Sequence, residues 1–529
     1  MTKNDHSSER RIALNAGSQY VALGLSMVVT FFMTPYLLLT VGKEHYSLLV
    51  IAFQLTLLLS VASRAITEGF NRFAATDYAR GDYAAMNSTV SAGLALSLVS
   101  AAVLGAAAAM VALFVDVLFG LTPDVIFTAR ILIAITACDA VVRLVMRVWL
   151  TPEYITQRFY FQSITTIIYL VVLVPVTVFM FNVYSPSIIT WITLKCGILM
   201  VVTWLVQRPL CRHALPELAP SLRLVKSWNQ LKSLASFSGM GSLGQLAVLL
   251  FYTCDSIIIS NLDELGIAMI AYYNVAQRWD PQIRSLLLAF VKVLTPMLAS
   301  DFALGNLDRV RNSFIRAVRY CFVLALYPCL CLIILATPMM THWLPPGYAE
   351  VCAPLLRLIL TGFIAGVPGY VGYEVLIGSG RIGKPMLFNF ACAVGNIVLS
   401  VFLVKFVGLG LEGVAMGSVS MLILSNGLAT PYMACRISGL SVGRFVRETY
   451  PRPFLGAIPL VICACTILQF WDAQNLLIVF AQFVVCGIVY AASVWAISLT
   501  SADRTKVIDA ISATASRFRA VYGKTTNAK

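Results

Sequence analysis

The feature that most constrains this chain is a succession of long apolar segments from one end to the other. Fourteen segments are long enough to span the hydrocarbon core of a membrane, and the polar stretches between them are mostly short. Of the 529 residues, 59% are hydrophobic and 12% are charged, about half the charged fraction of an ordinary soluble protein. The segments lie near residues 12–40, 46–68, 88–115, 129–149, 163–183, 187–206, 236–260, 268–297, 316–338, 353–377, 385–405, 412–433, 454–471 and 475–499. We therefore expect an all-α polytopic membrane protein with no soluble domain.

A short motif occurs twice, at an offset of 224 residues. Residues 75–82 (ATDYARGD) return as residues 299–306 (ASDFALGN), with four of the eight positions identical, and each copy follows two long apolar segments. Repetition of a helical unit in one orientation is typical of transporters built from two similar bundles. We expect two six-helix bundles related by this repeat, an N-lobe over 1–206 and a C-lobe over 236–433, followed by two further helices within 434–499.

Basic residues predict how the chain is oriented. They gather in the N-terminus, in the tail and in every second loop, whereas the opposite loops contain clearly only Lys43. Because cytoplasmic loops are rich in Lys and Arg, both termini are expected in the cytoplasm. The linker 207–235 and the basic tail 500–529 interleave apolar and basic residues, which predicts interfacial helices on the anionic inner leaflet. The net charge of +14 follows from this topology, so no nucleic-acid partner is expected.

The sequence contains no recognisable catalytic or metal site. The four histidines are scattered, and the cysteines lie mostly inside the apolar segments. The glycine-rich run 378–384 resembles a phosphate-binding loop, but Pro385 stands where Ser or Thr should hold magnesium, and the run joins two apolar helices. We therefore expect neither an enzyme nor a resident cofactor or metal, and transport driven by an ion gradient or by substrate flux.

Ionisable residues inside the apolar segments are the candidate functional residues. An Arg or Lys that faces lipid near the midplane costs about 2.5–3.5 kcal/mol, so these side chains are expected to face protein or water. We predict that Arg278 and Lys292 are unpaired cations of a central cavity, and that Asp280 and Arg284, four residues apart, form a structural ion pair. Further cations predicted to line the cavity are Arg64, Arg72, Arg143 and Arg147. The acidic candidates for coupling to a proton or a sodium ion are Asp255, Asp139 and Glu374.

Each of these residues has a structural alternative. The side chains of Arg72, Arg147 and Lys292 lie near the expected inner face and can reach the lipid headgroups instead. Asp139 and Arg143 can satisfy one another as an intrahelical pair, and Asp255 can cap or pair structurally. The glycines at 362, 366, 369 and 372 either let their helix bend or let it pack closely against a neighbour.

Short patterns along nearly the whole chain resemble one family. They are Leu14-Asn15, Thr34-Pro35-Tyr36-Leu37-Leu38, Gly42, Tyr46, Gly69, Arg72 and Gly81-Asp82 in the first two segments; Asp255-Ser256-Ile257-Ile258, Gly266, Tyr272-Tyr273 and Ala276-Gln277-Arg278 in the seventh and eighth; and Gly408, Gly410, Glu412-Gly413-Val414-Ala415 and Gly417 later. Together they resemble the polysaccharide transporter branch of the multidrug/oligosaccharidyl-lipid/polysaccharide (MOP) exporter superfamily.

The resemblance implies a Wzx-like flippase of the bacterial inner membrane. Such a protein moves a polyprenyl-pyrophosphate-linked oligosaccharide, an O-antigen or exopolysaccharide unit, between leaflets by alternating access, with the polysaccharide polymerase machinery as a further partner. Arginine forks suit phosphate oxygens, so Arg278, together with Arg64 and Arg143, is expected to bind the pyrophosphate. One alternative is a cation-coupled multidrug exporter of the same fold. Another is a lipid II-type flippase, disfavoured because the first helix carries Asn15 and Gln19 but not the arginine of those flippases.

Overall fold

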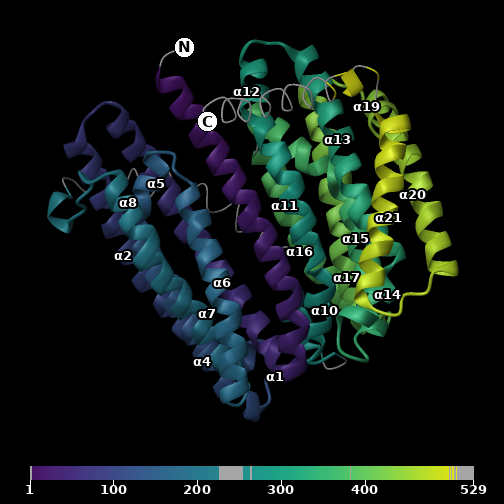
Figure 1. Cartoon of the computed structure of the whole chain (residues 1–529), viewed down its shortest axis with the longest axis horizontal. Helices are drawn as coiled ribbons and strands as arrows, with labels where there is room; N and C mark the ends of the chain where they lie inside the picture. Colours follow the sequence, from purple (N-terminus) through teal and green to yellow (C-terminus); the bar gives the residue numbers. More distant parts are fainter. Residues whose placement is uncertain are drawn as a thin grey trace, which may run out of the picture. The chain divides into compact units, whose positions relative to one another are not determined.

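The computed structural model describes residues 3–225, 254–262, 265–381 and 383–499, together with residues 501, 503–505 and 508. Within these ranges the side chains of residues 3–10, 12–13, 58–65, 293 and 296 are not described. The described residues are helices joined by short turns, with no β-strand among them, as Figure 1 shows. Eleven helices in this part of the chain are long and apolar enough to cross a membrane. The chain is therefore the all-α, multi-pass membrane protein that its apolar segments predict.

The chain divides into two compact units. Unit 1 comprises residues 1–275 and 389–418, and unit 2 comprises residues 276–388 and 419–529. Two side chains of residues 389–418, Asn396 and Ser418, are hydrogen-bonded to Asp255 of the N-terminal part, as described below. The expected lobes at 1–206 and 236–433 follow the sequence repeat rather than this packing, and they stay a prediction.

Unit 1 begins with α1 (Lys3–Ala79), which merges the first two expected segments into one long element. At Gly42 the backbone has φ 81° and ψ 166°, a conformation open almost only to glycine, and this kink falls in the expected gap between 40 and 46. The helices that follow are α2 (Tyr83–Leu113), α3 (Val115–Phe119), α4 (Pro123–Met146), α5 (Thr151–Ile155), α6 (Tyr160–Val183), α7 (Ile188–Val202) and α8 (Arg208–Ala214). Two short irregular helices, η1 (Arg147–Leu150) and η2 (Thr203–Gln207), continue α4 and α7.

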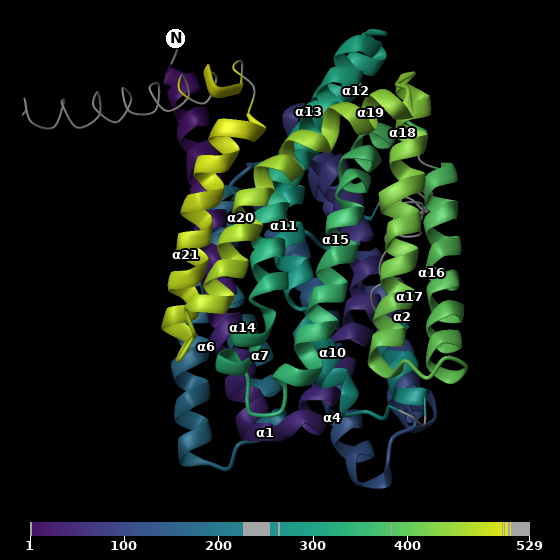
Figure 2. The ribbon, with the colours of Figure 1, turned by 90° about the vertical axis from the view of Figure 1, so that its right-hand side faces the viewer.

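Unit 2 is built around α13, which packs against α15 on one side and against the C-terminal pair α20 and α21. Figures 1 and 2 show α20 and α21 side by side. The helices of this unit are α11 (Trp279–Val291), η4 (Lys292–Leu294), α12 (Thr295–Ala303), α13 (Leu307–Ile334), α14 (Ala336–Trp343), α15 (Ala349–Gly378), η5 (Ile423–Ala429), α18 (Thr430–Ser438), α19 (Val442–Thr449), α20 (Pro451–Phe470), α21 (Leu476–Ser493) and η6 (Val494–Ser498). Three helices contain a boundary between the units: α10 (Met269–Gln277), α16 (Gly383–Lys405) and α17 (Gly410–Leu422).

The two copies of the repeated motif adopt the same local structure. Gly81 and Gly305 both have a left-handed backbone, with φ of 75° and 71°. The amide of Asp82 donates to the carbonyl of Asp77 at 3.1 Å, and the amide of Asn306 donates to the carbonyl of Asp301 at 2.9 Å. Each copy therefore ends one helix with a left-handed glycine and starts the next at an Asp or Asn, a turn that its own residues specify.

The expected helix over 268–297 is broken at two places. It consists of α10, α11, η4 and α12, with Arg278 as the turn residue between α10 and α11. The second interruption, η4, directly precedes Thr295 and Pro296 at the start of α12. Proline removes a backbone donor and crowds the preceding turn, which accounts for this break.

The glycines of α15 pack the helix closely against its neighbours. A Cβ atom at Gly369 would lie 2.4 Å from the carbonyl oxygen of Asn426 in η5, and one at Gly362 would lie 2.7 Å from Val419. Helix α15 itself is continuous from Ala349 to Gly378, despite prolines at 354 and 368. The close-packing alternative therefore describes this stripe of glycines better than a bend does.

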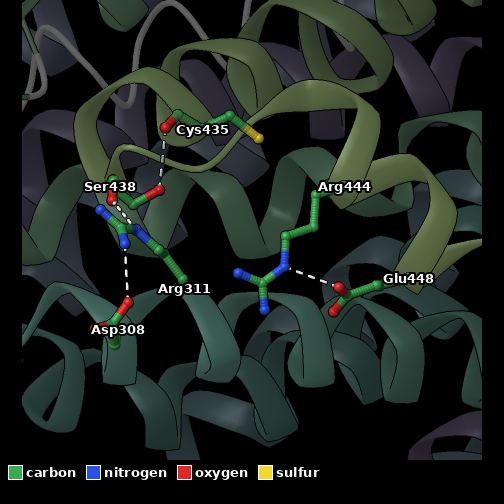
Figure 3. A network of polar contacts seen from close by, with 6 residues as sticks. All are labelled: Asp308, Arg311, Cys435, Ser438, Arg444 and Glu448. Carbon is green, nitrogen blue, oxygen red and sulfur yellow. Dashed lines mark hydrogen bonds and ion pairs between the residues drawn. The ribbon is translucent and has the colours of Figure 1, made fainter.

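Figure 3 shows polar contacts of unit 2 that link α13 to α18, together with an ion pair within α19. Arg311 donates through Nε to the carbonyl oxygen of Ser438 at 2.7 Å and through Nη1 to Asp308 at 2.8 Å. The Ser438 carbonyl is among the last of α18, so the arginine caps the end of that helix. In α19, Arg444 forms an ion pair with Glu448 at 2.8 Å.

The two expected interfacial helices fall largely outside the described residues. In the linker, Leu222–Leu224 form a single 3-10 turn and Val225 is extended. The rest of the linker and most of the tail are not described, so these interfacial helices stay predictions.

Candidate functional site

Unit 1 contains a polar cavity of about 490 Å³. It is lined by side chains from α1, from α4 with η1, from α5, from α6 and from α7 with η2. Among them are the predicted cavity residues Arg143 and Arg147. The lining is otherwise rich in hydroxyl and amide groups: Thr67, Asn71, Gln162, Thr165, Thr166, Thr203 and Gln207.

Arg143 enters this cavity as a member of an ion pair. Its guanidinium pairs with Asp139, one helical turn earlier in α4, and the two side chains are 41% and 8% exposed. The buried carboxylate orients the arginine, and the more exposed guanidinium, which has five N–H donors, belongs to a residue that lines the cavity. Asp139 is therefore placed as the partner of Arg143, as the intrahelical alternative expects. Arg147 lies one turn further on and is exposed.

The acidic residues of the cavity equal its arginines in number. Glu68 and Glu153 both line it, and Glu153 accepts a hydrogen bond from Nε2 of Gln207 at 2.8 Å. The lining of this cavity is thus balanced in formal charge, whereas cations prevail in the apolar segments as a whole.

Asn71 supplies an acceptor that has no partner. Its Oδ1 atom is buried and makes no hydrogen bond among the described residues, and the side chain is 9% exposed. A buried polar atom without a partner is destabilising by about 1–3 kcal/mol. This atom has almost no exposed surface, so Asn71 lines the cavity with the rest of its side chain.

Two other predicted cations belong to α1. Arg72 is exposed and lies one residue beyond the lining residue Asn71, and it is engaged in an interaction of its own. The Arg64 side chain lies outside the described residues, so its predicted role is not addressed by the structure.

Asp255 lies at the centre of a buried hydrogen-bond cluster, also in unit 1. Its carboxylate is 1% exposed and accepts from Tyr273 Oη at 2.6 Å, from Ser418 Oγ at 2.8 Å and from Asn396 Nδ2 at 3.3 Å. Ser400 Oγ also contacts this cluster, lying 3.1 Å from Asn396 Oδ1 and 3.3 Å from the carbonyl oxygen of Val414. No Lys, Arg or His of the described residues forms an ion pair with Asp255.

This cluster is an oxygen-rich environment around one carboxylate. Carboxylate, amide, hydroxyl and backbone carbonyl oxygens are the ligands that hard cations such as sodium prefer. A buried carboxylate without a cationic partner is expensive to keep charged, so it favours binding a proton or a small cation. In the described part of the chain, no group of three or more His, Cys, Asp or Glu side chains gathers as a metal site.

The remaining predicted residues belong to unit 2. Arg278 is half-buried at the break before α11 and is engaged in an interaction, so the expectation that it is unpaired is wrong. Asp280 and Arg284 form the ion pair that their spacing predicts. Lys292 is exposed at the end of α11. Glu374 is buried and accepts from Thr295 Oγ1 at 2.6 Å.

Uncharged polar residues are what the sequence reading missed. Asn396 and Ser418 lie inside expected apolar segments, and Asn71 and Gln207 lie just beyond the ends of two others, but the candidates predicted from the sequence are all ionisable. Amides buried in such segments must find partners for the same reason as charges do. An inventory of Asn and Gln in the apolar segments would have directed attention to Asn396, and one extended by a few residues beyond the segment ends would have included Asn71 and Gln207.

Comparison with known proteins identifies which proteins share this fold. No family model matches the sequence. Among solved structures, the lipid II flippase MurJ in an inward closed conformation matches with a TM-score of 0.65 at 13% identity, over 91% of this chain and 97% of that chain. An inward-facing multidrug resistance MATE family transporter of the MOP superfamily matches with a TM-score of 0.64 at 14% identity, over 78% of this chain and 94% of that chain. The chain therefore has the fold of the MOP transporters.

A relative is found by sequence as well. The membrane protein EpsK of Bacillus subtilis (strain 168), described as uncharacterized, is 23% identical over 460 residues, which are 86% of this chain and 88% of EpsK. The likeness along most of both chains agrees with a common architecture.

Proposed function

We propose that this protein is a flippase for a polyprenyl-pyrophosphate-linked oligosaccharide, an O-antigen or exopolysaccharide unit, in the bacterial inner membrane. The observation that carries the proposal is the composition of the cavity in unit 1. The hydroxyl and amide groups that line this cavity suit sugar hydroxyls. Arg143 and Arg147 suit the oxygens of a pyrophosphate. The likeness of fold to the lipid II flippase MurJ supports the same class of transporter.

Transport in this proposal uses alternating access, coupled to a small cation at Asp255. The buried carboxylate with its oxygen neighbours supports a proton or sodium site better than Asp139 does, since Asp139 pairs with Arg143. Glu374 accepts a hydrogen bond from Thr295 and stays a second candidate. Arg278, at the break between α10 and α11, stays a candidate for contact with the pyrophosphate.

A second function is favoured by one observation. Glu68 and Glu153 line the cavity alongside the arginines, and acidic groups in a transport cavity suit organic cations. A multidrug exporter of this fold is therefore the competing proposal for the class of transporter. A lipid II-type flippase is the competing proposal for the lipid-linked substrate.

The test uses cells that lack the native gene and produce variants of the full chain. Arg147→Ala and Arg143→Lys are compared with Arg80→Ala, an exposed arginine in the turn after α1. We expect Arg147→Ala to reduce surface glycan while the lipid-linked intermediate accumulates at the inner leaflet, at unchanged protein level. Arg143→Lys keeps the charge beside Asp139 but loses the fork, so a partial defect is expected. A null strain with normal surface glycan and increased sensitivity to cationic dyes would contradict the flippase and favour the exporter.

A further inference from the structure

A second pocket in unit 1 is entirely apolar in its lining. This groove has a volume of about 650 Å³ and is formed by α4 with η1 and by α7 with η2. Val145 and Trp149 contribute one wall, and Val201, Trp204 and Leu205 contribute the other. Its volume lies in the range of about 300–1,000 Å³ that is usual for small-ligand sites.

The groove and the polar cavity use different faces of the same two helices. On α7 and η2, Leu199, Thr203 and Gln207 line the cavity at intervals of four residues, whereas Val201, Trp204 and Leu205 line the groove. Since α4 and α7 pack against each other, this helix pair forms the wall between the two spaces. One face of the wall is polar and the other is hydrocarbon-like.

Met146 lines both spaces. It is 9% exposed and ends α4, directly before the 3-10 helix η1. At the π-helix η2, α7 likewise departs from regular α geometry, and interruptions of this kind often mark functional sites. An unbranched methionine side chain changes its conformation readily. Met146 is therefore suited to separate the two spaces and to move aside so that they connect.

Trp204 is held in a defined orientation at the groove. The Arg208 guanidinium lies 3.7 Å from the centre of its ring, a cation–π contact that favours one placement of the indole. A wall of the groove is thereby preformed, which reduces the entropy lost when an apolar chain binds.

We propose that this groove binds the hydrocarbon chain of the amphipathic substrate while its polar head occupies the neighbouring cavity, with Met146 at the passage between them. The inference rests on the proposed function. A long chain cannot follow its head into the polar cavity, because each CH₂ group kept from water or polar surroundings gains about 0.8 kcal/mol. Because the groove shares Met146 with the cavity, the hydrocarbon chain can lie in apolar surroundings directly beside its polar head.

The experiment uses the purified full-length protein in lipid nanodiscs. Two photoreactive polyprenyl pyrophosphates are used, one with a diazirine in the chain and one with a diazirine close to the pyrophosphate, and labelled peptides are identified by mass spectrometry. We expect the chain probe to label residues 141–149 and 200–205, and the head probe to label residues lining the cavity. Unlabelled polyprenyl pyrophosphate should compete with both probes, whereas an excess of phosphatidylglycerol should not.

Two variants that fill the groove and one matched control sharpen the test. Val145→Trp and Val201→Trp should reduce labelling by the chain probe about tenfold, the change that 1.4 kcal/mol produces. Val171→Trp places the same side chain on α6, at a position 59% exposed that lines neither space, and should leave labelling unchanged. Thermal stability in the nanodisc shows whether each variant is folded, and the competition arm needs no substitution.

The outcomes separate the two proposals. Competition by phosphatidylglycerol equal to that by the pyrophosphate, or chain labelling unaffected by both tryptophans, would mean that ordinary bilayer lipid fills the groove. Saturable head labelling in the cavity without chain labelling in the groove would overturn this inference and leave the proposed function standing. No saturable labelling by either probe would contradict both.

Discussion

The Ser418 hydroxyl lies 2.8 Å from one carboxylate oxygen of Asp255 and 3.0 Å from the other. These two residues are 163 positions apart in the chain, and Asn396 and Tyr273 complete the surroundings of the carboxylate. The arrangement gathers oxygen atoms around a single buried negative charge.

We expect Asp255→Asn to abolish cation-dependent stabilisation of the purified protein, because it removes the charge but retains the size of the side chain. Ser418→Ala removes one hydrogen bond to a charged group, worth about 1.5–3 kcal/mol, and should weaken the dependence without abolishing it. The measurement is the melting temperature against sodium concentration and against pH. Asp124→Asn, at an exposed position in the first turn of α4, is the control. If Asp255→Asn retains the full response, the cluster has a structural role only.

We expect Thr295→Val to lower the stability of unit 2, because it removes the hydrogen bond that Thr295 donates to Glu374. The Thr295 hydroxyl donates to Oε2 of this buried glutamate at 2.6 Å, and valine has the same shape without the donor. A loss of about 1.5–3 kcal/mol is expected, measured as a lower melting temperature. Thr341→Val, at an exposed position whose hydroxyl bonds only within its own helix, should change stability by much less. If the two substitutions lower the melting temperature equally, the Thr295–Glu374 hydrogen bond does not stabilise the protein more than the exposed hydroxyl of Thr341 does.

Two glycines of α15 provide a matched pair. A Cβ atom at Gly369 would lie 2.4 Å from the backbone oxygen of Asn426 and 2.5 Å from its Cα atom, whereas at Gly366 the nearest atom would lie 3.5 Å away. Gly369→Ala must push η5 away from α15, because backbone atoms cannot rotate aside, and overpacking of this kind is destabilising by about 1–3 kcal/mol. Gly366→Ala should be tolerated. The measurement is the yield of monodisperse protein and its melting temperature, and the prediction is wrong if both variants behave alike.

The junction between α18 and α19 offers a second pair. Gly439 has φ +67°, and a Cβ atom there would lie 2.7 Å from Nη2 of Arg311, the residue that caps α18 (Figure 3). Gly439→Ala should therefore be destabilising by about 1–2 kcal/mol from the left-handed backbone alone. Gly443→Ala, four residues later with no atom within 4 Å, should be neutral or slightly stabilising in its helix. A chemical-denaturation or melting comparison distinguishes the two, and an unaffected Gly439→Ala variant would refute the steric argument.

Much of the architecture could be predicted from the sequence. The positions of α2, α6, α15 and α21 agree with expected apolar segments to within a few residues, since the length and hydropathy of a membrane helix are local properties. The break at Gly42 falls in the gap between two expected segments, because glycine permits the backbone conformation found there. The unexpected result is the compact grouping of residues 389–418 with unit 1.

The candidate sites were predictable only in part. Charge at i,i+4 spacing was enough to predict the pair Asp280–Arg284, and it offered Asp139–Arg143 as one of two alternatives. It could not show that Arg143 and Arg147 share a cavity with Glu153, because Glu153 comes from a separate helix and is bonded to Gln207, 54 residues away. Nor could it show that Arg278 has a partner.

The sequence by itself determined the class of the protein, the extent of most helices and the turns at Gly81 and Gly305, because each depends on neighbouring residues and their periodicity. Only the tertiary structure decided which groups come together: Asp255 is hydrogen-bonded to Asn396 and Ser418, Asn71 lines the same cavity as Arg143 and Arg147, and Met146 lines both cavity and groove. Hydropathy indicates that a helix is buried in lipid or protein. It does not determine the rotation of the helix about its own axis or which helices it contacts. Those are settled by packing between helices, where a shift of one residue turns a different side chain toward the partner.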